Sequence, residues 1–289
     1  MLRQVCYGLP GPDATRTAHY ENMSLPIKLI STDFDGTIFA EFENPPIPAR
    51  LVSLIGDLQA RGVKWVINTG RDMSSLMEAL ARSRISIQPD ALVLVEREIH
   101  FHRDSRYVGH EEWNLRCARL HRELFVRVRA DLPRLREWID DRFTATVYED
   151  PYSPFCLLAG NNGDADAIHE YLEDYCREVP HLTVVRNDVY ARFAHAAYNK
   201  GTALAEIARR FGVRAEHILV AGDHLNDLPM LSREHARWLV APANAIAPVK
   251  ELLRREQGFV SLHSHGHGVA EGLEECLREC APGHAAALV

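Results

Sequence analysis

The chain has 289 residues, of which 46% are hydrophobic and 25% are charged, and its formal net charge is −7. These proportions are those of a globular protein, and they exclude a disordered, collagen-like or fibrous chain. The acidic balance disfavours a dedicated nucleic-acid binder, because a phosphate backbone requires a basic surface. No apolar run approaches the roughly 20 residues of a membrane-spanning helix.

The first 24 residues differ in composition from the rest. They contain no apolar stretch of the kind found in secretory signals, and they are rich in Gly, Pro, Asp and Thr. We interpret residues 1–24 as an irregular tail outside the core, with Met23 as a candidate start. The cysteines form no CxxC pair, which favours a reduced, cytoplasmic protein over a disulfide framework.

From residue 27 onward, short apolar runs alternate with amphipathic segments. The pattern predicts five elements in chain order: a strand at 27–32, a helix at 48–62, a strand at 63–68, a helix at 73–82 and a strand at 91–95. Strands that alternate with helices are typical of a parallel sheet with crossover helices. The fold class is therefore predicted to be α/β.

The alternation of apolar runs and amphipathic segments resumes after residue 196. We predict helices at 199–212, 228–235, 247–256 and 268–280, and strands at 217–222, 237–241 and 259–262. The length of the chain suggests two domains, or one domain with an insertion.

Residues 104–195 have a different order of predicted helices and strands. Helices are predicted at 110–129 and 164–177, and strands at 144–149, 155–160, 182–187 and 190–195. Neighbouring strands beside helices favour an antiparallel sheet in an α+β module. We therefore predict a core over 25–103 and 196–289 and an inserted module over 104–195.

The strongest chemical motif is the run from Asp33 to Thr37, Asp-Phe-Asp-Gly-Thr, directly after the first strand. Carboxylates two residues apart on extended chain share a face. Such a pair attracts a hard divalent cation, or divides the work of nucleophile and acid/base. The alternative is a solvated turn.

Three further motifs follow strands or begin helices. Thr69-Gly70-Arg71 offers a hydroxyl and backbone N–H groups to a phosphate, although Thr-Gly is also ordinary turn chemistry. Lys200 supplies a compact positive charge for an oxyanion, or is a solvated residue at a helix start. The run 222–227, Gly-Asp-His-Leu-Asn-Asp, adds two carboxylates and an amide, or forms a helix N-cap.

Taken in order, DFDGT, TGR, NKG and GDHLND resemble the motif set of the haloacid dehalogenase-like (HAD) hydrolase superfamily. An insertion between the second and third motifs is similar to that of the Cof-like and sucrose-phosphatase-like group. The resemblance implies a three-layer core with a parallel sheet and an inserted cap. It also implies a Mg²⁺-dependent phosphatase for small phosphomonoesters, sugar phosphates among them.

The resemblance assigns a role to each carboxylate. Asp33 is implied to be the nucleophile that forms an aspartyl phosphate, and Asp35 the acid and then the base. Mg²⁺ is implied to bind Asp33, the backbone carbonyl of Asp35, and Asp223. Asp227 is implied to be an orienting carboxylate.

Five residues are implied to bind the phosphoryl group of the substrate. They are Thr69, Gly70, Arg71, Lys200 and Asn226. A cation and Lys200 would neutralise the charge of the phosphoryl group and its attacking carboxylate, which is the main task in phosphoryl transfer. A cap would exclude water and contact the leaving group.

One segment departs from the family pattern. Relatives of this type often carry Asn-Gly after the third strand, whereas this chain has Glu96, Arg97 and Glu98. We therefore expect different contacts with the leaving group.

Two further groups of residues are ambiguous. His263, His265 and His267 would share one face of a strand and suit a metal, or they lie in a solvated loop before the last helix. Four arginines of the insertion are candidates for an anionic substrate tail: Arg127, Arg129, Arg186 and Arg192.

Two alternative functions stay open. A phosphomutase of the phosphomannomutase type would use a similar core and cap but retain the phosphoryl group. A catalytically inactive binding or regulatory module is disfavoured by the complete motif set. The expected partner is a small phosphorylated metabolite, with no nucleic acid or membrane, and the oligomeric state is open.

Overall fold

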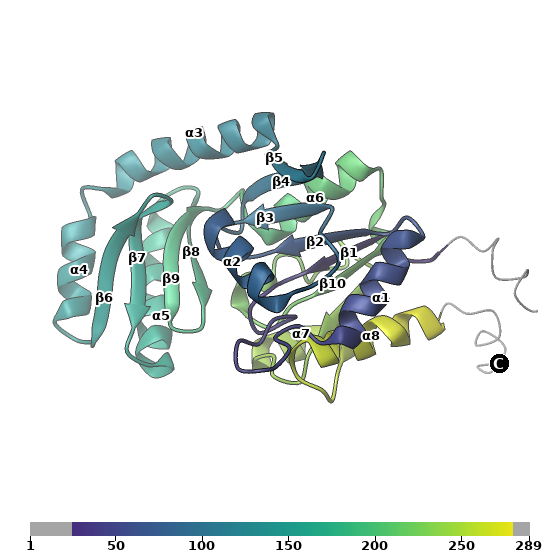
Figure 1. The fold of residues 1–289 in the computed structure, drawn as a ribbon. Helices are drawn as coiled ribbons and strands as arrows, with labels where there is room; N and C mark the ends of the chain where they lie inside the picture. Colours follow the sequence, from purple (N-terminus) through teal and green to yellow (C-terminus); the bar gives the residue numbers. More distant parts are fainter. Residues whose placement is uncertain (1–24, 280–289) are drawn as a thin grey trace, which may run out of the picture.

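The computed structural model describes residues 25–279. The predicted tail at 1–24 and the last ten residues, including Cys280 of the predicted final helix, lie outside the described residues. Two β-sheets lie side by side in the described chain, and α3 (Glu111–Val128) runs from one to the other (Figure 1). No helix within residues 25–279 combines the length and apolar character needed to cross a bilayer.

The larger sheet has eight strands in the order β12-β11-β10-β1-β2-β3-β4-β5. Its strands are β1 (Leu29–Thr32), β2 (Lys64–Asn68), β3 (Ala91–Leu94), β4 (Glu98–Arg103), β5 (Arg106–Gly109), β10 (Ile218–Ala221), β11 (Trp238–Ala241) and β12 (Phe259–Val260). The strands from β12 to β3 are parallel to one another, whereas β4 and β5 are antiparallel additions. The predicted parallel α/β core is confirmed, and its antiparallel edge was missed.

Helices cover both faces of this sheet, which makes three layers. They are α1 (Ala49–Ala60), α2 (Met73–Ser83), α6 (Lys200–Phe211), α7 (Ala247–Arg255) and α8 (His265–Glu279). Helices α1, α2 and α8 share one buried apolar cluster with alternate strand residues such as Ile30 and Ile67. Helices α6 and α7 share a second cluster with the intervening residues, such as Leu29 and Val66. Near-continuous apolar strands are what a sheet covered on both faces requires.

The smaller sheet is antiparallel, with its four strands in the order β6-β7-β9-β8. Its elements are β6 (Ala145–Asp150), β7 (Ser153–Ala159), β8 (Leu182–Asn187), β9 (Tyr190–His195), α4 (Leu132–Asp140) and α5 (Asn162–Glu178). A third apolar cluster joins one face of this sheet to the two helices, through residues such as Phe155, Phe193 and Leu172. The opposite face, which we call the open face, carries the alternate side chains.

We propose that this sheet and its helices form an inserted cap over residues 110–195. A boundary at 104 would separate β5 from the sheet to which it belongs, because β5 pairs with β4. Helix α3 links the two parts: Trp113 lies in a core cluster, and Leu124 lies in the cluster of the cap.

Two local predictions are wrong. The segment 228–235 forms turns after a short 3-10 helix at Leu225–Asp227, and not an α-helix. Met230 and His235 donate their backbone N–H groups to the carbonyls of Asp227 and Ser232, three positions earlier, so the segment forms turns in place of a continuous α-helical ladder. The last helix begins at His265, three residues before the predicted start at 268, so His265 and His267 lie in its first turn and neither on a strand nor in a loop.

Candidate active site

The loops after β1 and β10 and the start of α6 meet at one edge of the large sheet, as the carboxyl ends of parallel strands do. Lys200 Nζ lies 2.5 Å from Asp33 Oδ1 and 2.6 Å from Asp227 Oδ1. The Lys200 side chain is fully buried. The structure thus joins three predicted residues that are far apart in the sequence.

The local sequence fixes Lys200 at the first position of α6. Asn199 is the N-cap, and it forms a capping box with Thr202. Gly201 permits the close approach of the next segment, because a Cβ there would lie 2.2 Å from the carbonyl oxygen of Pro229. Asn68, at the end of β2, donates to the Lys200 carbonyl over 3.0 Å. Asn68 was not predicted, although a polar residue that ends an apolar strand is a usable signal.

Asp223 follows β10 and lies against the first motif. Thr37 Oγ1 donates to Asp223 Oδ1 over 2.6 Å. Gly36 has φ of 78°, and a Cβ there would lie 2.5 Å from Asp223 Oδ2. Glycine is therefore required at position 36 both for its conformation and for the room beside Asp223.

Asp227 is committed to contacts within the protein. One carboxylate oxygen accepts from the backbone N–H groups of Asp223 and His224, at 2.8 and 3.0 Å, and the other accepts from Lys200. These bonds fix both the lysine and the Asp223 loop, so the geometry suits an orienting carboxylate.

Charge is unbalanced in this cluster. Asp33, Asp223 and Asp227 are all buried, and each offers an oxygen within 4.8 Å of the others. Burial, and then the charge of Asp227, raise the pKa of Asp223 to about 7, and the same two causes raise the pKa of Asp33 well above its usual range. Burial lowers the pKa of Lys200, but Asp227 and Asp33 more than offset it, so the net shift is upward.

A single lysine does not neutralise three carboxylates. A set of carboxylate oxygens with excess negative charge fits a hard divalent cation. Within residues 25–279, Asp33, Asp223 and Asp227 form the group of His, Cys, Asp and Glu side chains that could hold a metal ion. Two of the three predicted metal ligands, Asp33 and Asp223, belong to it, and Asp35 was expected to contribute only its backbone carbonyl.

Asp35 lies outside this group of three carboxylates and pairs with Arg71. The guanidinium donates from Nη2 and Nε to the two carboxylate oxygens, at 2.6 and 2.7 Å. Arg71 also donates to Ser75 Oγ, and it lies 5.5 Å from the ring centres of Phe34 and Phe39. In this state Arg71 positions Asp35, and its predicted contact with the substrate phosphate stays a prediction.

The other predicted phosphate-binding residues gather around the loop after β2. Thr69 is buried, and its Oγ1 accepts from the backbone N–H of Arg71. Asn226 Nδ2 donates to Glu96 Oε1 over 2.8 Å, and Asn226 Oδ1 is buried without a hydrogen-bond partner among residues 25–279. The link between Asn226 and Glu96 was not predicted, because it joins two loops 130 residues apart.

A cleft of about 800 Å³ separates these loops from the cap. Asp35, Gly36 and Asp223 line it from the core, and the hairpin between β8 and β9 lines it from the cap. The hairpin touches the core where the backbone N–H of Asp188 donates to His224 Nε2 over 3.1 Å. His224 belongs to the fourth motif, but this contact with the cap could not be read from the motif.

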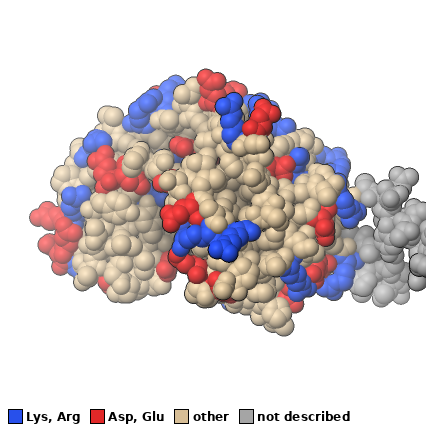
Figure 2. All heavy atoms as spheres, viewed as in Figure 1, with Lys and Arg blue, Asp and Glu red and all other residues tan. Residues whose placement is uncertain are grey.

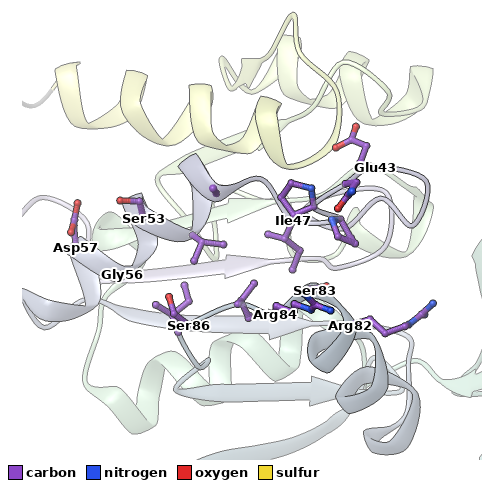
Figure 3. A pocket seen from close by; sticks show the side chains of 16 residues that line it. Glu43, Ile47, Ser53, Gly56, Asp57, Arg82, Ser83, Arg84 and Ser86 are labelled. Carbon is purple, nitrogen blue, oxygen red and sulfur yellow. The ribbon is translucent and has the colours of Figure 1, made fainter.

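A larger groove, about 940 Å³, lies between α1 and the segment after α2 (Figure 3). Ile47, Ser53, Arg82 and Ser86 are among the residues that line it. It contains none of the predicted site residues. Asp35 and Asp223 line the smaller cleft instead, so the candidate active site is the cleft between core and cap.

Comparisons with known proteins agree with this geometry. A family model described as haloacid dehalogenase-like hydrolase matches residues 135–273. A phosphoglycolate phosphatase from Methanothermobacter thermautotrophicus is 30% identical over 113 residues, which cover 39% of this chain and 46% of that protein. The chain spans less than half the length of the curated relatives that it matches.

Solved structures match over most of the chain. The sucrose-phosphatase from Synechocystis sp. PCC6803, solved with sucrose and phosphate, has a TM-score of 0.64 and 18% identity, and the match covers 87% of this chain and 98% of that one. A HAD/COF-like hydrolase from Plasmodium vivax has a TM-score of 0.62 and 16% identity, with 88% and 96% covered. These likenesses show the fold. The matching family model covers just under half of the chain, and together with the four motifs at one sheet edge it makes the chain similar to the haloacid dehalogenase-like hydrolases.

Proposed function

We propose that the chain is a Mg²⁺-dependent phosphatase that hydrolyses small phosphomonoesters through an aspartyl phosphate on Asp33. The observation that carries this proposal is the position of Asp33. It is held by the buried Lys200 beside Asp223, at the sheet edge that faces the cap. Matched relatives named phosphoglycolate phosphatase, and a structural neighbour named sucrose-phosphatase, support phosphoester chemistry.

Mg²⁺ would be held by Asp33, Asp223 and the backbone carbonyl of Asp35. The donor set fits, because the buried carboxylates outnumber the lysine and because Gly36 leaves room beside Asp223. When bound, the ion supplies positive charge that offsets the repulsion between the phosphoryl group and the attacking carboxylate.

The side chains of the chain itself account for the two chemical steps. In the first, an oxygen of Asp33 attacks phosphorus, the bond from phosphorus to the leaving oxygen breaks, and Asp35 donates a proton to that oxygen. In the second, Asp35 takes a proton from water, the water oxygen attacks phosphorus, and the bond to Asp33 breaks to release phosphate. Arg71 fixes the position of the Asp35 carboxylate through both of its oxygens.

Four groups would bind the phosphoryl oxygens. They are Lys200, Thr69, Asn226 and the backbone around Gly70. Lys200 is positioned before substrate arrives, because Asn199, Asn68 and Asp227 fix its backbone and side chain. Charged groups that need no reorganisation are the most effective at stabilising a transition state.

The test is release of inorganic phosphate from a panel of phosphorylated metabolites by the full-length chain with Mg²⁺. We expect turnover of at least one sugar or polyol phosphate, and its loss when a chelator removes the metal. A phosphomutase would instead yield an isomer that keeps its phosphoryl group, and it would depend on a bisphosphate activator. A folded protein that releases phosphate from no ester on the panel would contradict the proposal.

A further inference from the structure

The structure distinguishes one arginine among the four that the sequence left as candidates. Arg129 pairs with Glu149 and Arg186 with Asp166, both within the cap. Arg192, on β9, instead reaches the core, where its Nη2 donates to the carbonyl oxygen of Gly70 over 3.3 Å. Gly70 belongs to the loop proposed to bind phosphate, so Arg192 connects the cap to that loop.

Arg192 retains hydrogen-bonding capacity. Its side chain is only 8% exposed, yet Nε and Nη1 have no hydrogen-bond partner among residues 25–279. The nearest carboxylate, Asp150, is 4.0 Å from Nη1, which is an ion pair too long for a hydrogen bond. A buried guanidinium with two unused donors is costly unless another molecule uses them.

The open face of the cap continues from Arg192. The ring of Tyr190 lies 5.0 Å from the guanidinium. Tyr148 and Leu158, on β6 and β7, are 38% and 49% exposed, and they share this face because they pair across the strands with Cys156 and Tyr190. The surface over β6 and β7 is mostly uncharged (Figure 2). Exposed aromatic and apolar side chains beside a buried arginine suit a leaving group with carbon surface and oxygen atoms.

On the core side, Glu96 approaches the same loop from a strained turn. Val95 and Glu96 have positive φ values of 49° and 65°, which is unfavourable, above all for the β-branched valine. The turn is held by the backbone bonds from Val95 to Arg71 and from Glu96 to Thr69, at 3.0 and 2.9 Å. Strain of this kind is retained where the local geometry serves a function.

The turn brings the Glu96 carboxylate to the predicted phosphate-binding loop. Glu96 is buried, its Oε1 accepts from Asn226, and a Cβ on Gly70 would lie 3.3 Å from that oxygen. Burial lowers the pKa of the Arg192 guanidinium. The negative charge of Glu96, together with Tyr190 and Asp150, raises it by more, so the net shift of the pKa is upward. Glu96 and Arg192 therefore act on one another across Gly70.

We propose that Arg192 and Glu96 form the leaving-group subsite and that Glu96 restricts it to uncharged, hydroxylated leaving groups. A hydroxyl can accept from Arg192 and donate to Glu96 or to the unpartnered Asn226 Oδ1, whereas a carboxylate can only accept. Glu96 and Asp150 both act against the charge of Arg192, so an anionic leaving group gains little attraction there. This inference rests on the proposed phosphatase function.

The test compares two esters that differ in one group. Glycerol 3-phosphate carries a hydroxymethyl group where 3-phosphoglycerate carries a carboxylate. For the full-length chain with Mg²⁺, we expect kcat/KM to favour glycerol 3-phosphate by about tenfold or more, because like charges in a partly buried site repel strongly.

The variant Glu96→Gln should move this ratio toward 3-phosphoglycerate by about tenfold, since the amide keeps an acceptor for Asn226 but removes the charge. The matched control is Glu251→Gln, which removes the same charge from an exposed position on α7 and should leave the ratio unchanged. Arg192→Gln should lower kcat/KM for glycerol 3-phosphate about tenfold more than for p-nitrophenyl phosphate, which lacks the hydroxyls.

A wild-type preference for 3-phosphoglycerate, or a ratio that Glu96→Gln leaves unchanged while turnover persists, would overturn the inference and leave the phosphatase proposal standing. Failure to release phosphate from either ester and from p-nitrophenyl phosphate would overturn both. If Glu96→Gln does not fold, the wild-type inhibition constants of the two esters against p-nitrophenyl phosphate decide. Equal constants, or tighter binding of 3-phosphoglycerate, would overturn the inference.

Discussion

The core and the cap face one another across one cleft, but the core edge and the open face of the cap are built in different ways. At the core edge, Lys200 is fully buried and both of its carboxylate partners lie within 2.6 Å. On the cap, Tyr148 and Leu158 are exposed, and Arg192 has donors without partners. The side chains proposed to transfer the phosphoryl group are therefore held in place before substrate binds, whereas the side chains proposed to recognise the leaving group keep free donors and exposed surface for it.

The largest expected effect comes from the core. Asp33→Asn should lower kcat by about 10³-fold or more, because an amide does not attack phosphorus and binds a hard cation poorly. The fold should survive, since Lys200 keeps its bond to Asp227. Phosphate release measures the loss of kcat, and circular dichroism checks that the fold survives. The control is Asp57→Asn on the exposed face of α1. Substantial residual turnover would show that Asp33 is not the nucleophile.

Lys200→Met should damage both activity and stability. Three buried carboxylates would lose their only close cation among the described residues, and breaking a buried ion pair in this way costs about 3–5 kcal/mol of unfolding free energy. We expect kcat to fall by about 10²-fold or more as well. Urea unfolding measures the loss of unfolding free energy. An unchanged midpoint and slope would mean that the carboxylates do not depend on Lys200.

A cap substitution should separate recognition from chemistry. Arg192→Ala should lower kcat/KM for a preferred metabolite about tenfold, while p-nitrophenyl phosphate, which barely reaches the cap, should lose less than about threefold. Arg129→Ala is the matched control, because Arg129 is exposed and pairs with Glu149 away from Gly70. Equal losses on both substrates would assign the cap to the catalytic machinery and remove the contrast between the two regions.

The smallest effect concerns pH and the metal-free protein. The raised pKa values of Asp33 and Asp223 mean that the folded state binds more protons than the unfolded state between the usual aspartate value and about 7. The unfolding free energy should therefore fall as pH rises through this window. In a chelator, the melting temperature should drop by a few degrees from pH 5 to pH 8, and Mg²⁺ should restore it.

The control for this effect is Asp223→Asn, which should flatten the dependence of the melting temperature on pH. A melting temperature that rises with pH in the chelated wild-type protein would contradict the excess of negative charge that we assign to the core edge.

The sequence by itself determined the parallel core and the positions of its motifs. The strands are short, continuously apolar and separated by amphipathic helices, so local patterns place their ends and the polar residues that follow, such as Asp33, Thr69 and Asp223. Because parallel strands end at one edge, these residues could be expected to meet. The antiparallel edge was missed because β4 (Glu98–Arg103) alternates charged, histidine and apolar residues and does not resemble the other strands.

Only the tertiary structure decided which side chains pair across the cleft. Arg71 lies on Asp35, Asn226 on Glu96 and Arg192 on Gly70, and none of these partners follows from spacing along the chain. Four arginines of the insertion were equal candidates in the sequence, because each carries the same charge and no local pattern selects among them. They differ in burial and in the partners that the packing of core against cap leaves within reach, and these depend on contacts between residues more than 100 positions apart, as between Gly70 and Arg192.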